Sequence, residues 1–551
     1  MGARPLVIAA VIAAAVTITT VAQVASPLSA GPIRTSGGLV AGHALSSGVN
    51  AWLGIPFAKP PVGDLRWRAP EANTWPGVYN ADRKMPQCIQ ILRPRDINHF
   101  FGEEATSENC LFMNIWAPPT ATATSRLPVV VFLYGGGSTV GSSGMALYGG
   151  EEVARRGAVF VNFNYRLGIL GFMAHPDLTR ESGRNASGNW AYLDQVAALQ
   201  WIQRNIAQFG GDPAKVIISG QSAGAGAVSL LQASPIAKGL FRGVVAMSGG
   251  TWGQGGTGGQ ARAEAEKIGL RVQETLKVDS LAAMRQVPPD RLLALQSETQ
   301  LGATGGGPIR VGGSVDGYFL PDTPAALFAA KRNSDVPVIA GFANDESNNG
   351  LRQARTVAEY TAIVEKALGA RAAEFLKRYP VRADADVAEM AKAAAREGGV
   401  LRTARNWAMA QNRWTSSSTY IYNLSRVHPF NPQALASDRV DLIGAYHTSD
   451  VPYWFGTLDA FNMFRPTRLW QAADRQLSQT MTSLLIAFAN TGVPSAAGVT
   501  WPAWSSSSEQ LLEFGASGVA ARPIDGARVD FVATTAGQWP AATPRAITIR
   551  D

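Results

Sequence analysis

The chain has 551 residues, 46% hydrophobic and 16% charged, a composition that excludes a disordered protein and can fill a large core. The formal net charge is +8, but the basic residues are scattered, so no basic run predicts a nucleic-acid surface. The positive excess weakly favours anionic ligands. The length is compatible with several domains or with one large α/β domain.

The first 25 residues are typical of a signal peptide. One basic residue, Arg4, precedes an apolar run over residues 6–16, and small residues follow. We expect cleavage between about residues 22 and 30, and a mature protein that is secreted or periplasmic. The alternative is an uncleaved anchor, because residues 6–24 approach the length of a membrane-spanning helix. We expect no other insertion into a membrane.

The chain contains two cysteines, Cys88 and Cys110. In an exported protein such a pair most simply forms one disulfide. A cytosolic location would instead favour two buried free thiols.

Residues 127–134 form a continuous apolar run that predicts a buried strand. The run ends in Gly135, Gly136 and Gly137, where backbone N–H groups can point into a cavity without obstruction by side chains. A second buried strand is predicted over 158–164, and apolar spacing predicts a helix over 189–206. Strand, helix and strand in this order indicate parallel pairing with right-handed crossovers.

The sequence FGGDPAKVIISGQSAG, residues 209–224, follows that helix. A Gly-rich turn leads into a short strand over 216–218 and then into Gly220, Gln221, Ser222, Ala223 and Gly224. A strand that enters G-x-S-x-G and leaves as a helix predicts a nucleophile elbow, with Ser222 projecting above the carboxyl edge of the sheet. Side chains at 220 and 224 would collide with the neighbouring strand and helix. The alternative is a chance motif in a chain with 57 glycines.

Strands are also predicted over 243–247, 336–342 and 420–424, and a helix over 478–490. Residues 251–335 and 346–440 are predicted to be helical and Gly-rich insertions that form the walls of a pocket. Asp345 and Glu346 come directly after a strand, so either can lie on the same sheet edge as Ser222. The alternative for an acidic pair after a strand is a helix N-cap with a solvent-exposed neighbour, and one of the two is expected to have such a role.

A serine nucleophile needs a base, and histidine is the usual one at neutral pH. In such sheets the triad runs serine, acid, histidine along the chain, which leaves His428 and His447 as candidates. His447 lies among small residues that leave an imidazole accessible, and it is the favoured candidate.

The chain resembles the type-B carboxylesterase and cholinesterase family of α/β-hydrolases. The matching segments occur in the family's order and span nearly all of the predicted mature chain, 26–551: GIPFAKPPVGDLRW at 54–67, ENCLFMNIW at 108–116, YGGG at 134–137, NYRLGILGF at 164–172, the serine segment at 209–224, DGYFLP at 316–321, NDES at 344–347 and GAYH at 444–447 with a downstream WFG.

The resemblance implies a single α/β-hydrolase domain with a large, mostly parallel sheet. It also implies a nucleophile, an acid and a base at Ser222, Glu346 and His447. The oxyanion-hole N–H groups would belong to Gly136, Gly137 and Ala223, and Cys88 and Cys110 would form the family's N-terminal disulfide. No metal or organic cofactor is implied.

Four departures from the family pattern stand out. Asn109 replaces an acidic residue, and Ser347 replaces a glycine after the acid. Ser138 replaces an aromatic residue after the glycine triplet, which predicts a wider pocket. The segment between the cysteines has no tryptophan for holding a quaternary ammonium, which disfavours a cholinesterase.

We therefore expect an exported serine carboxylic-ester hydrolase that acts on a small-molecule ester through an acyl-enzyme. Alternatives are a lipase, an esterase for bulky or polycarboxylate natural-product esters such as a mycotoxin, and an inactive cholinesterase-like binding protein. Nothing in the sequence sets the acyl or alcohol preference or the oligomeric state.

Overall fold

The computed structural model describes residues 31–92, 105–254, 256, 258–296, 309–434 and 443–541. The predicted signal peptide and parts of both predicted insertions lie outside these ranges. Within them, no helix combines the length and apolar character that crossing a bilayer requires.

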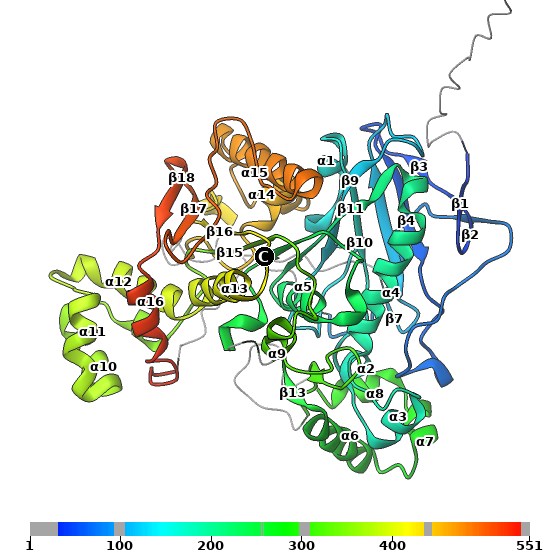
Figure 1. Cartoon of the computed structure of the whole chain (residues 1–551), viewed down its shortest axis with the longest axis horizontal. Coiled ribbons are helices and arrows are strands. Elements are labelled where there is room, and N and C mark those ends of the chain that lie inside the picture. The colour runs from blue at the N-terminus through cyan, green and yellow to red at the C-terminus, as the bar shows by residue number, and fades with distance from the viewer. Residues whose placement is uncertain are drawn as a thin grey trace, which may run out of the picture.

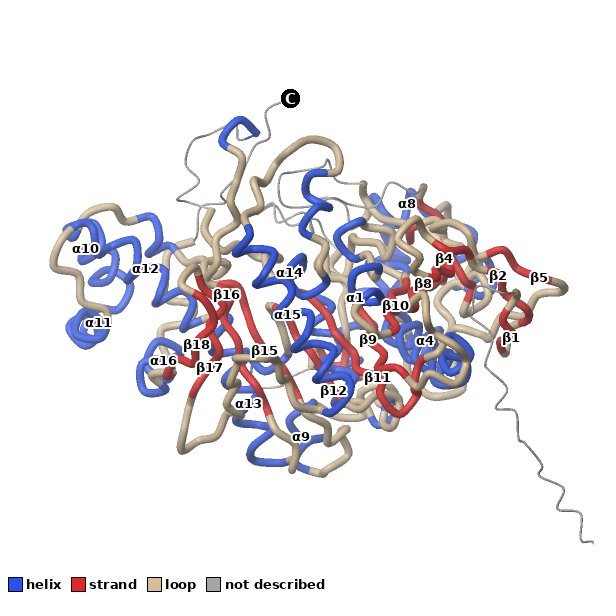
Figure 2. Tube along the Cα trace, turned by 90° about the horizontal axis from the view of Figure 1, so that it is seen from above, coloured by secondary structure: helices blue, strands red, loops and turns tan. Residues whose placement is uncertain are grey.

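An eleven-stranded sheet runs through the centre of the described chain (Figures 1 and 2). Neighbouring pairs from β10 to β17 are parallel, and the strands at both ends are antiparallel. The large, mostly parallel sheet predicted from the sequence is therefore confirmed. In spatial order the strands are β18 (Gly518–Pro523), β17 (Gln510–Gly515), β16 (Thr419–Leu424), β15 (Val338–Ala343), β12 (Gly243–Met247), β11 (Gly211–Gln221), β9 (Leu127–Leu133), β10 (Val159–Phe163), β8 (Phe112–Ala117), β4 (Asn50–Pro56) and β3 (His43–Ala44).

Two layers of helices bury this sheet. One face carries α1 (Glu151–Arg155), α14 (Val451–Phe455) and α15 (Ala472–Thr491), and the other carries α4 (Trp190–Asn205), α5 (Ala223–Ala233) and α13 (Val400–Trp414) (Figure 1). Because both faces are covered, the central strands read as continuous apolar runs: every residue of β10, β12 and β15 is buried. The helix predicted over 478–490 is longer than expected, since α15 begins at Ala472.

A helical subdomain packs beside the sheet (Figure 1, lower right). Its own apolar cluster, which includes Trp67, Met173, Val272 and Met284, is separate from the main core. The helices are α2 (Gly168–Phe172), α3 (Pro176–Glu181), α6 (Arg262–Leu276), α7 (Leu281–Gln286) and α8 (Pro289–Ala294). The first predicted insertion thus supplies α6 to α8, and α9 (Pro324–Ala329) lies under the sheet near α5 and α13.

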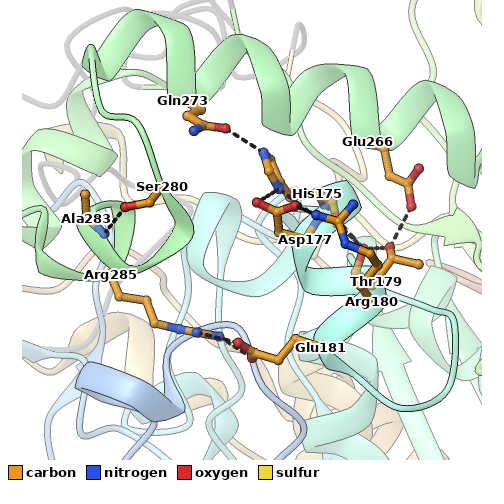
Figure 3. Close-up of polar contacts among 11 residues, drawn as sticks. His175, Asp177, Thr179, Arg180, Glu181, Glu266, Gln273, Ser280, Ala283 and Arg285 are labelled. Atoms are coloured by element: carbon orange, nitrogen blue, oxygen red, sulfur yellow. Dashed lines mark hydrogen bonds and ion pairs between the residues drawn. The ribbon is translucent and has the colours of Figure 1, made fainter.

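Polar contacts fasten this insertion to α3 (Figure 3). His175, which caps α3, contacts Gln273 of α6 through Nε2 at 2.8 Å. One helical turn later, Thr179 donates to Glu266 at 2.6 Å. Arg285 of α7 binds Glu181 through two hydrogen bonds of 2.6 and 2.8 Å. These contacts, among them a charge-assisted pair, hold the insertion against α3 beside the sheet.

The second predicted insertion forms a helical lobe at the other end of the sheet (Figure 1, left). Its apolar cluster is centred on Tyr360, Phe375 and Tyr379. The lobe comprises α10 (Val357–Leu368), α11 (Ala372–Arg378) and α12 (Asp384–Gly398), and α16 (Gly526–Ala533) packs against α12 and α13.

The two sequence motifs at 54–67 and 108–116 are in contact. Arg66 forms a bidentate pair with Glu108, at 2.6 and 2.7 Å. Two residues after Glu108, Cys110 is joined to Cys88, and both cysteines are buried. The remaining strands form small sheets: β1 (Ile33–Thr35), β2 (Gly38–Ala41) and β5 (Val78–Asn80); β6 (Gln87–Cys88) and β7 (Thr106–Ser107); β13 (Gln260–Ala261) and β14 (Ser314–Val315).

Candidate active site

Ser222 occupies a sharp turn between β11 and α5. Its φ of 57° and ψ of −120° lie outside the regions that side-chain-bearing residues usually adopt, which is strain stored at the tip of the elbow. The flanking glycines are required by close backbone contacts. A Cβ at Gly220 would lie 2.3 Å from the carbonyl oxygen of Gly224, and a Cβ at Gly224 would lie 2.1 Å from that of Leu133.

The predicted glycine triplet lies against this elbow. A Cβ at Gly135 would be 2.7 Å from the Cβ of Ser222, so the backbone after β9 approaches the serine closely. Gly136 and Gly137 adopt φ values of 94° and 62°. The turn is closed by the N–H groups of Thr139 and Val140, which both donate to the Gly136 carbonyl at 3.1 Å.

The backbone N–H groups near Ser222 that have no protein acceptor among the described residues include those of Gly136, Gly137 and Ala223. The Ala223 group is one of the unpaired donors that every helix leaves in its first turn, here the first turn of α5. Groups of this kind can stabilise negative charge on a substrate oxygen. The structure therefore brings the three predicted oxyanion-hole residues to the region of the elbow.

Glu346 and His447 meet at the same edge of the sheet. Glu346 follows β15, and its Oε1 accepts a hydrogen bond from the Ala343 N–H at 2.9 Å. Its Oε2 accepts a short hydrogen bond from His447 Nδ1. The Glu346 side chain is 3% exposed and that of His447 is 42% exposed, so the imidazole projects from a buried carboxylate toward open space.

The far nitrogen of His447 faces the elbow. His447 Nε2 lies 3.1 Å from the side-chain amide Nε2 of Gln221, the residue before Ser222. With Nδ1–H donated to Glu346, Nε2 carries the lone pair and accepts from this amide, which is the tautomer that a general base requires. Ser222 Oγ and His447 are not hydrogen-bonded here; such contacts often form only once substrate is bound. Neither Gln221 nor its contact was singled out from the sequence.

Desolvation by the surrounding protein opposes protonation of His447, but the hydrogen bond and charge of Glu346, together with the charge of Asp450, raise its pKa above the usual value. Asp450 is itself fully buried, and Tyr422 donates to its Oδ2 at 2.5 Å. Desolvation, with a contribution from the charge of Glu346, raises the pKa of Asp450 to about 6. Asp450 was not predicted as part of the site, and its only signal in the sequence is its place three residues after His447.

The side chains of Asp345 and Glu346 are both buried, and neither residue caps a helix, so the prediction that one of the two has such a role is wrong. Asp345 is buried, and its Oδ2 accepts from the Ala445 N–H at 2.8 Å. Lys392 lies 3.2 Å from its other oxygen. The carboxylate is used inside the fold, where it holds the loop that carries His447.

His428, the other candidate base, lies elsewhere in the fold. Its Nε2 contacts the Ser449 carbonyl at 2.8 Å, and its Nδ1 contacts Tyr446 and Arg468 at 3.1 and 3.2 Å. Burial, reinforced by the charge of Arg468, lowers the pKa of His428 well below the usual value. A neutral, buried imidazole of this kind packs the interior and is not placed to exchange protons with a substrate.

The remaining predicted departures have local consequences. Ser138 adopts a φ of 61°, and its carbonyl accepts from the Gly168 N–H at 2.8 Å. Ser347 Oγ accepts from the Val400 N–H at 3.4 Å, at the beginning of α13. Ser347, in place of the family glycine, thus contacts the first turn of α13.

The mostly parallel sheet, the covering helices and the serine elbow at the carboxyl end of β11 define an α/β-hydrolase. The chain belongs to the Carboxylesterase family, whose sequence model matches residues 29–532. It is accordingly a carboxylic ester hydrolase.

Full-length relatives agree with this assignment. The chain is 33% identical over 489 residues to the fumonisin B1 esterase of Sphingopyxis macrogoltabida, covering 88% of this chain and 86% of that protein. It is 30% identical over 479 residues to the para-nitrobenzyl esterase of Bacillus subtilis (strain 168), covering 85% and 91%. A solved PNB esterase structure superimposes with a TM-score of 0.73 at 28% identity, covering 91% of this chain and 99% of that one.

Proposed function

We propose that the chain is an exported serine esterase in which Ser222 is the nucleophile, His447 the general base and Glu346 the residue that orients it. The observation that carries the proposal is the buried Glu346 bound to His447 Nδ1, with Nε2 presented to the residue beside Ser222. This leaves one nitrogen able to take a proton next to a strained, glycine-flanked serine.

The reaction would run in two halves. His447 Nε2 removes the Ser222 proton as Oγ attacks the ester carbonyl carbon, and the resulting oxyanion is bound by N–H groups of Gly136, Gly137 and Ala223. The carbon–oxygen bond to the alcohol then breaks, and the alcohol leaves with the proton from His447. Water, deprotonated by His447, attacks the acyl-enzyme and releases the acid, with the proton returned to Ser222.

Turnover of a 4-nitrophenyl ester by Ser222→Ala tests this mechanism. The variant should lose activity by roughly 10³-fold or more, with an unchanged thermal unfolding midpoint, because the oxyanion donors alone leave only a residual rate. Turnover at the wild-type rate would show that another residue is the nucleophile.

Export is supported by the apolar segment after Arg4 and by the joined pair Cys88–Cys110, since such pairs persist in oxidising compartments. Expression of the full-length gene followed by N-terminal sequencing tests it. A mature protein outside the cytoplasm that begins near residue 26 is the expected product. A full-length chain retained with the membrane would instead favour the uncleaved anchor.

A bulky natural-product ester is the second candidate substrate. It is favoured over a lipid by one observation: the fumonisin B1 esterase matches this chain along most of both proteins. Comparing turnover of fumonisin B1 with that of a long-chain triacylglycerol separates the two, and faster hydrolysis of the triacylglycerol would reject the natural-product ester.

A further inference from the structure

A pocket of about 450 Å³ lies next to the elbow, and no residue of the proposed mechanism lines it. One wall is the segment after β12, and the other is the beginning of α13. Its lining residues include Gly250, Thr251, Gly399, Arg402 and Thr403. This volume is within the range of small-molecule sites.

Two close contacts tie this pocket to the reacting residues. Gly249, at the start of the first wall, lies so near the elbow that a Cβ there would be 2.5 Å from the Ser222 carbonyl oxygen. Gly399, on the second wall, is equally close to Ser347, where a Cβ would be 2.7 Å from Oγ. Ser347 directly follows Glu346. The first wall therefore begins against the backbone of the elbow, and the second wall contacts the residue that follows Glu346.

Arg402 is the only charged side chain among the described residues that line the pocket. Its Nε is buried with no hydrogen-bond partner, and its Nη1 reaches only the Ala533 carbonyl at 3.4 Å. Arg405, on the same helix, does have carboxylate partners. It pairs with Glu509 and Asp530 at 2.5 and 2.6 Å. No carboxylate of the described residues pairs with Arg402.

The position of Arg402 on α13 makes this lack of a partner informative. The residue lies in the first turn of a 15-residue helix, where the helix dipole already places positive charge. A cation at that end is electrostatically unfavourable, and an anion bound there would offset the repulsion. The guanidinium and the dipole both attract an anion into the pocket.

We propose that Arg402 binds a free carboxylate on the acyl part of the substrate, so that the enzyme prefers esters of di- or polycarboxylic acids. The inference rests on the proposed function, because the proposed role of His447 as the base is what identifies the acyl side of the substrate site. The leaving alcohol must face His447, which protonates it, and no residue of the His447 loop lines this pocket. A planar guanidinium matches a carboxylate through two parallel hydrogen bonds.

The test compares two esters with six-carbon acyl chains, mono-4-nitrophenyl adipate and 4-nitrophenyl hexanoate. The quantity measured is the ratio of their kcat/KM values at low salt. Arg402→Met should lower this adipate-to-hexanoate ratio roughly 10- to 100-fold, because a charge-assisted hydrogen bond is lost. Arg402→Lys keeps the charge but not the planar fork, so the ratio should fall by less.

Arg413→Met is the matched control, because Arg413 is exposed on the same helix and its loss changes the net charge by the same amount. Its ratio should equal that of the wild type. An unchanged ratio in both Arg402 variants, or an equal fall in Arg413→Met, would overturn the assignment. Failure of the underlying mechanism is distinct, because it would appear as Ser222→Ala turning over both esters.

Discussion

Asp345 and Ala445 exchange two hydrogen bonds: the Asp345 N–H donates to the Ala445 carbonyl at 2.9 Å, and the Ala445 N–H donates to Asp345 Oδ2 at 2.8 Å. Gly444 makes the approach possible, because a Cβ there would lie 2.2 Å from Oδ2. Since Glu346 follows Asp345 and His447 lies two residues after Ala445, this clamp holds the segments that carry Glu346 and His447 together.

Breaking the clamp should therefore reduce activity without removing either partner. Asp345→Ala leaves the buried Ala445 N–H unpaired, which should cost about 1–3 kcal/mol of unfolding free energy. We expect kcat/KM to fall roughly 10-fold or more as His447 moves. Asp345→Asn retains an acceptor for the same N–H and should lose much less of both quantities. Equal losses in the two variants would show that the charge, and not the hydrogen bond, is what matters.

Glu346 should behave differently from its neighbour. Glu346→Gln keeps the size of the side chain, but its amide cannot stabilise an imidazolium and can bind the wrong tautomer of His447. We expect kcat to fall roughly 10³- to 10⁴-fold with little change in KM. Single-turnover kinetics beside Asp345→Asn provide the measurement, and a comparable loss in Asp345→Asn would instead make Asp345 the acid.

Much of this arrangement follows from the sequence. A continuous apolar run must be buried on both faces, which predicted the strands of the parallel sheet, and glycines at 220 and 224 can be explained only by close backbone contacts. The family resemblance selected Glu346 and His447 from their pairs. These predictions depend on local patterns and on chain order.

The missed features depend on contacts between distant segments. Nothing near Asp345 in the sequence indicates that Ala445, a hundred residues later, supplies its hydrogen-bond donor. Likewise, the sequence does not show that Arg402 lacks a carboxylate partner. This is seen only once the segment after β12 is placed against α13. An acidic or basic residue does not reveal from sequence alone whether folding brings it a partner.

The pH dependence of activity should report the charges around His447. Because the imidazole must be neutral to act as a base and its pKa is raised, kcat/KM should fall as the pH drops through a value above 6.5. Asp450→Asn removes one charge that raises the pKa and should move this acid limb to lower pH. Gln221→Glu adds a buried negative charge beside Nε2 and should move it to higher pH.

The two shifts in opposite directions make this a stringent test. Profiles of kcat/KM between pH 5 and 9, with thermal unfolding measured at each pH, separate the titration from loss of fold. Acid limbs that coincide in all three proteins would show that a group other than His447 controls the rate.

The Cys88–Cys110 link should contribute to stability more than to catalysis. Cysteines 22 residues apart close a loop. Cross-linking a loop of this length lowers the conformational entropy of the unfolded chain and stabilises the fold by about 3 kcal/mol. The double variant Cys88→Ala/Cys110→Ala should lose about that amount of unfolding free energy, and its kcat at low temperature should remain within about twofold of the wild type. Denaturant unfolding of the wild type with and without reductant provides an independent measurement, and an unchanged midpoint under reduction would argue against the link.

The glycine triplet allows the oxyanion hole to be tested by conformation alone. Both Gly136 and Gly137 have positive φ, but a Cβ at Gly136 would lie 2.1 Å from the Val140 carbonyl oxygen, whereas the nearest atom to a Cβ at Gly137 is 3.8 Å away. Gly137→Ala should therefore fold, at a cost of about 1 kcal/mol for the left-handed backbone. Its displaced N–H should lower kcat at least 10-fold, part of the roughly 10²- to 10³-fold that such a donor contributes. Gly136→Ala should lose stability and activity together. If Gly137→Ala folds and keeps the wild-type kcat, the assignment of Gly137 to the oxyanion hole is wrong.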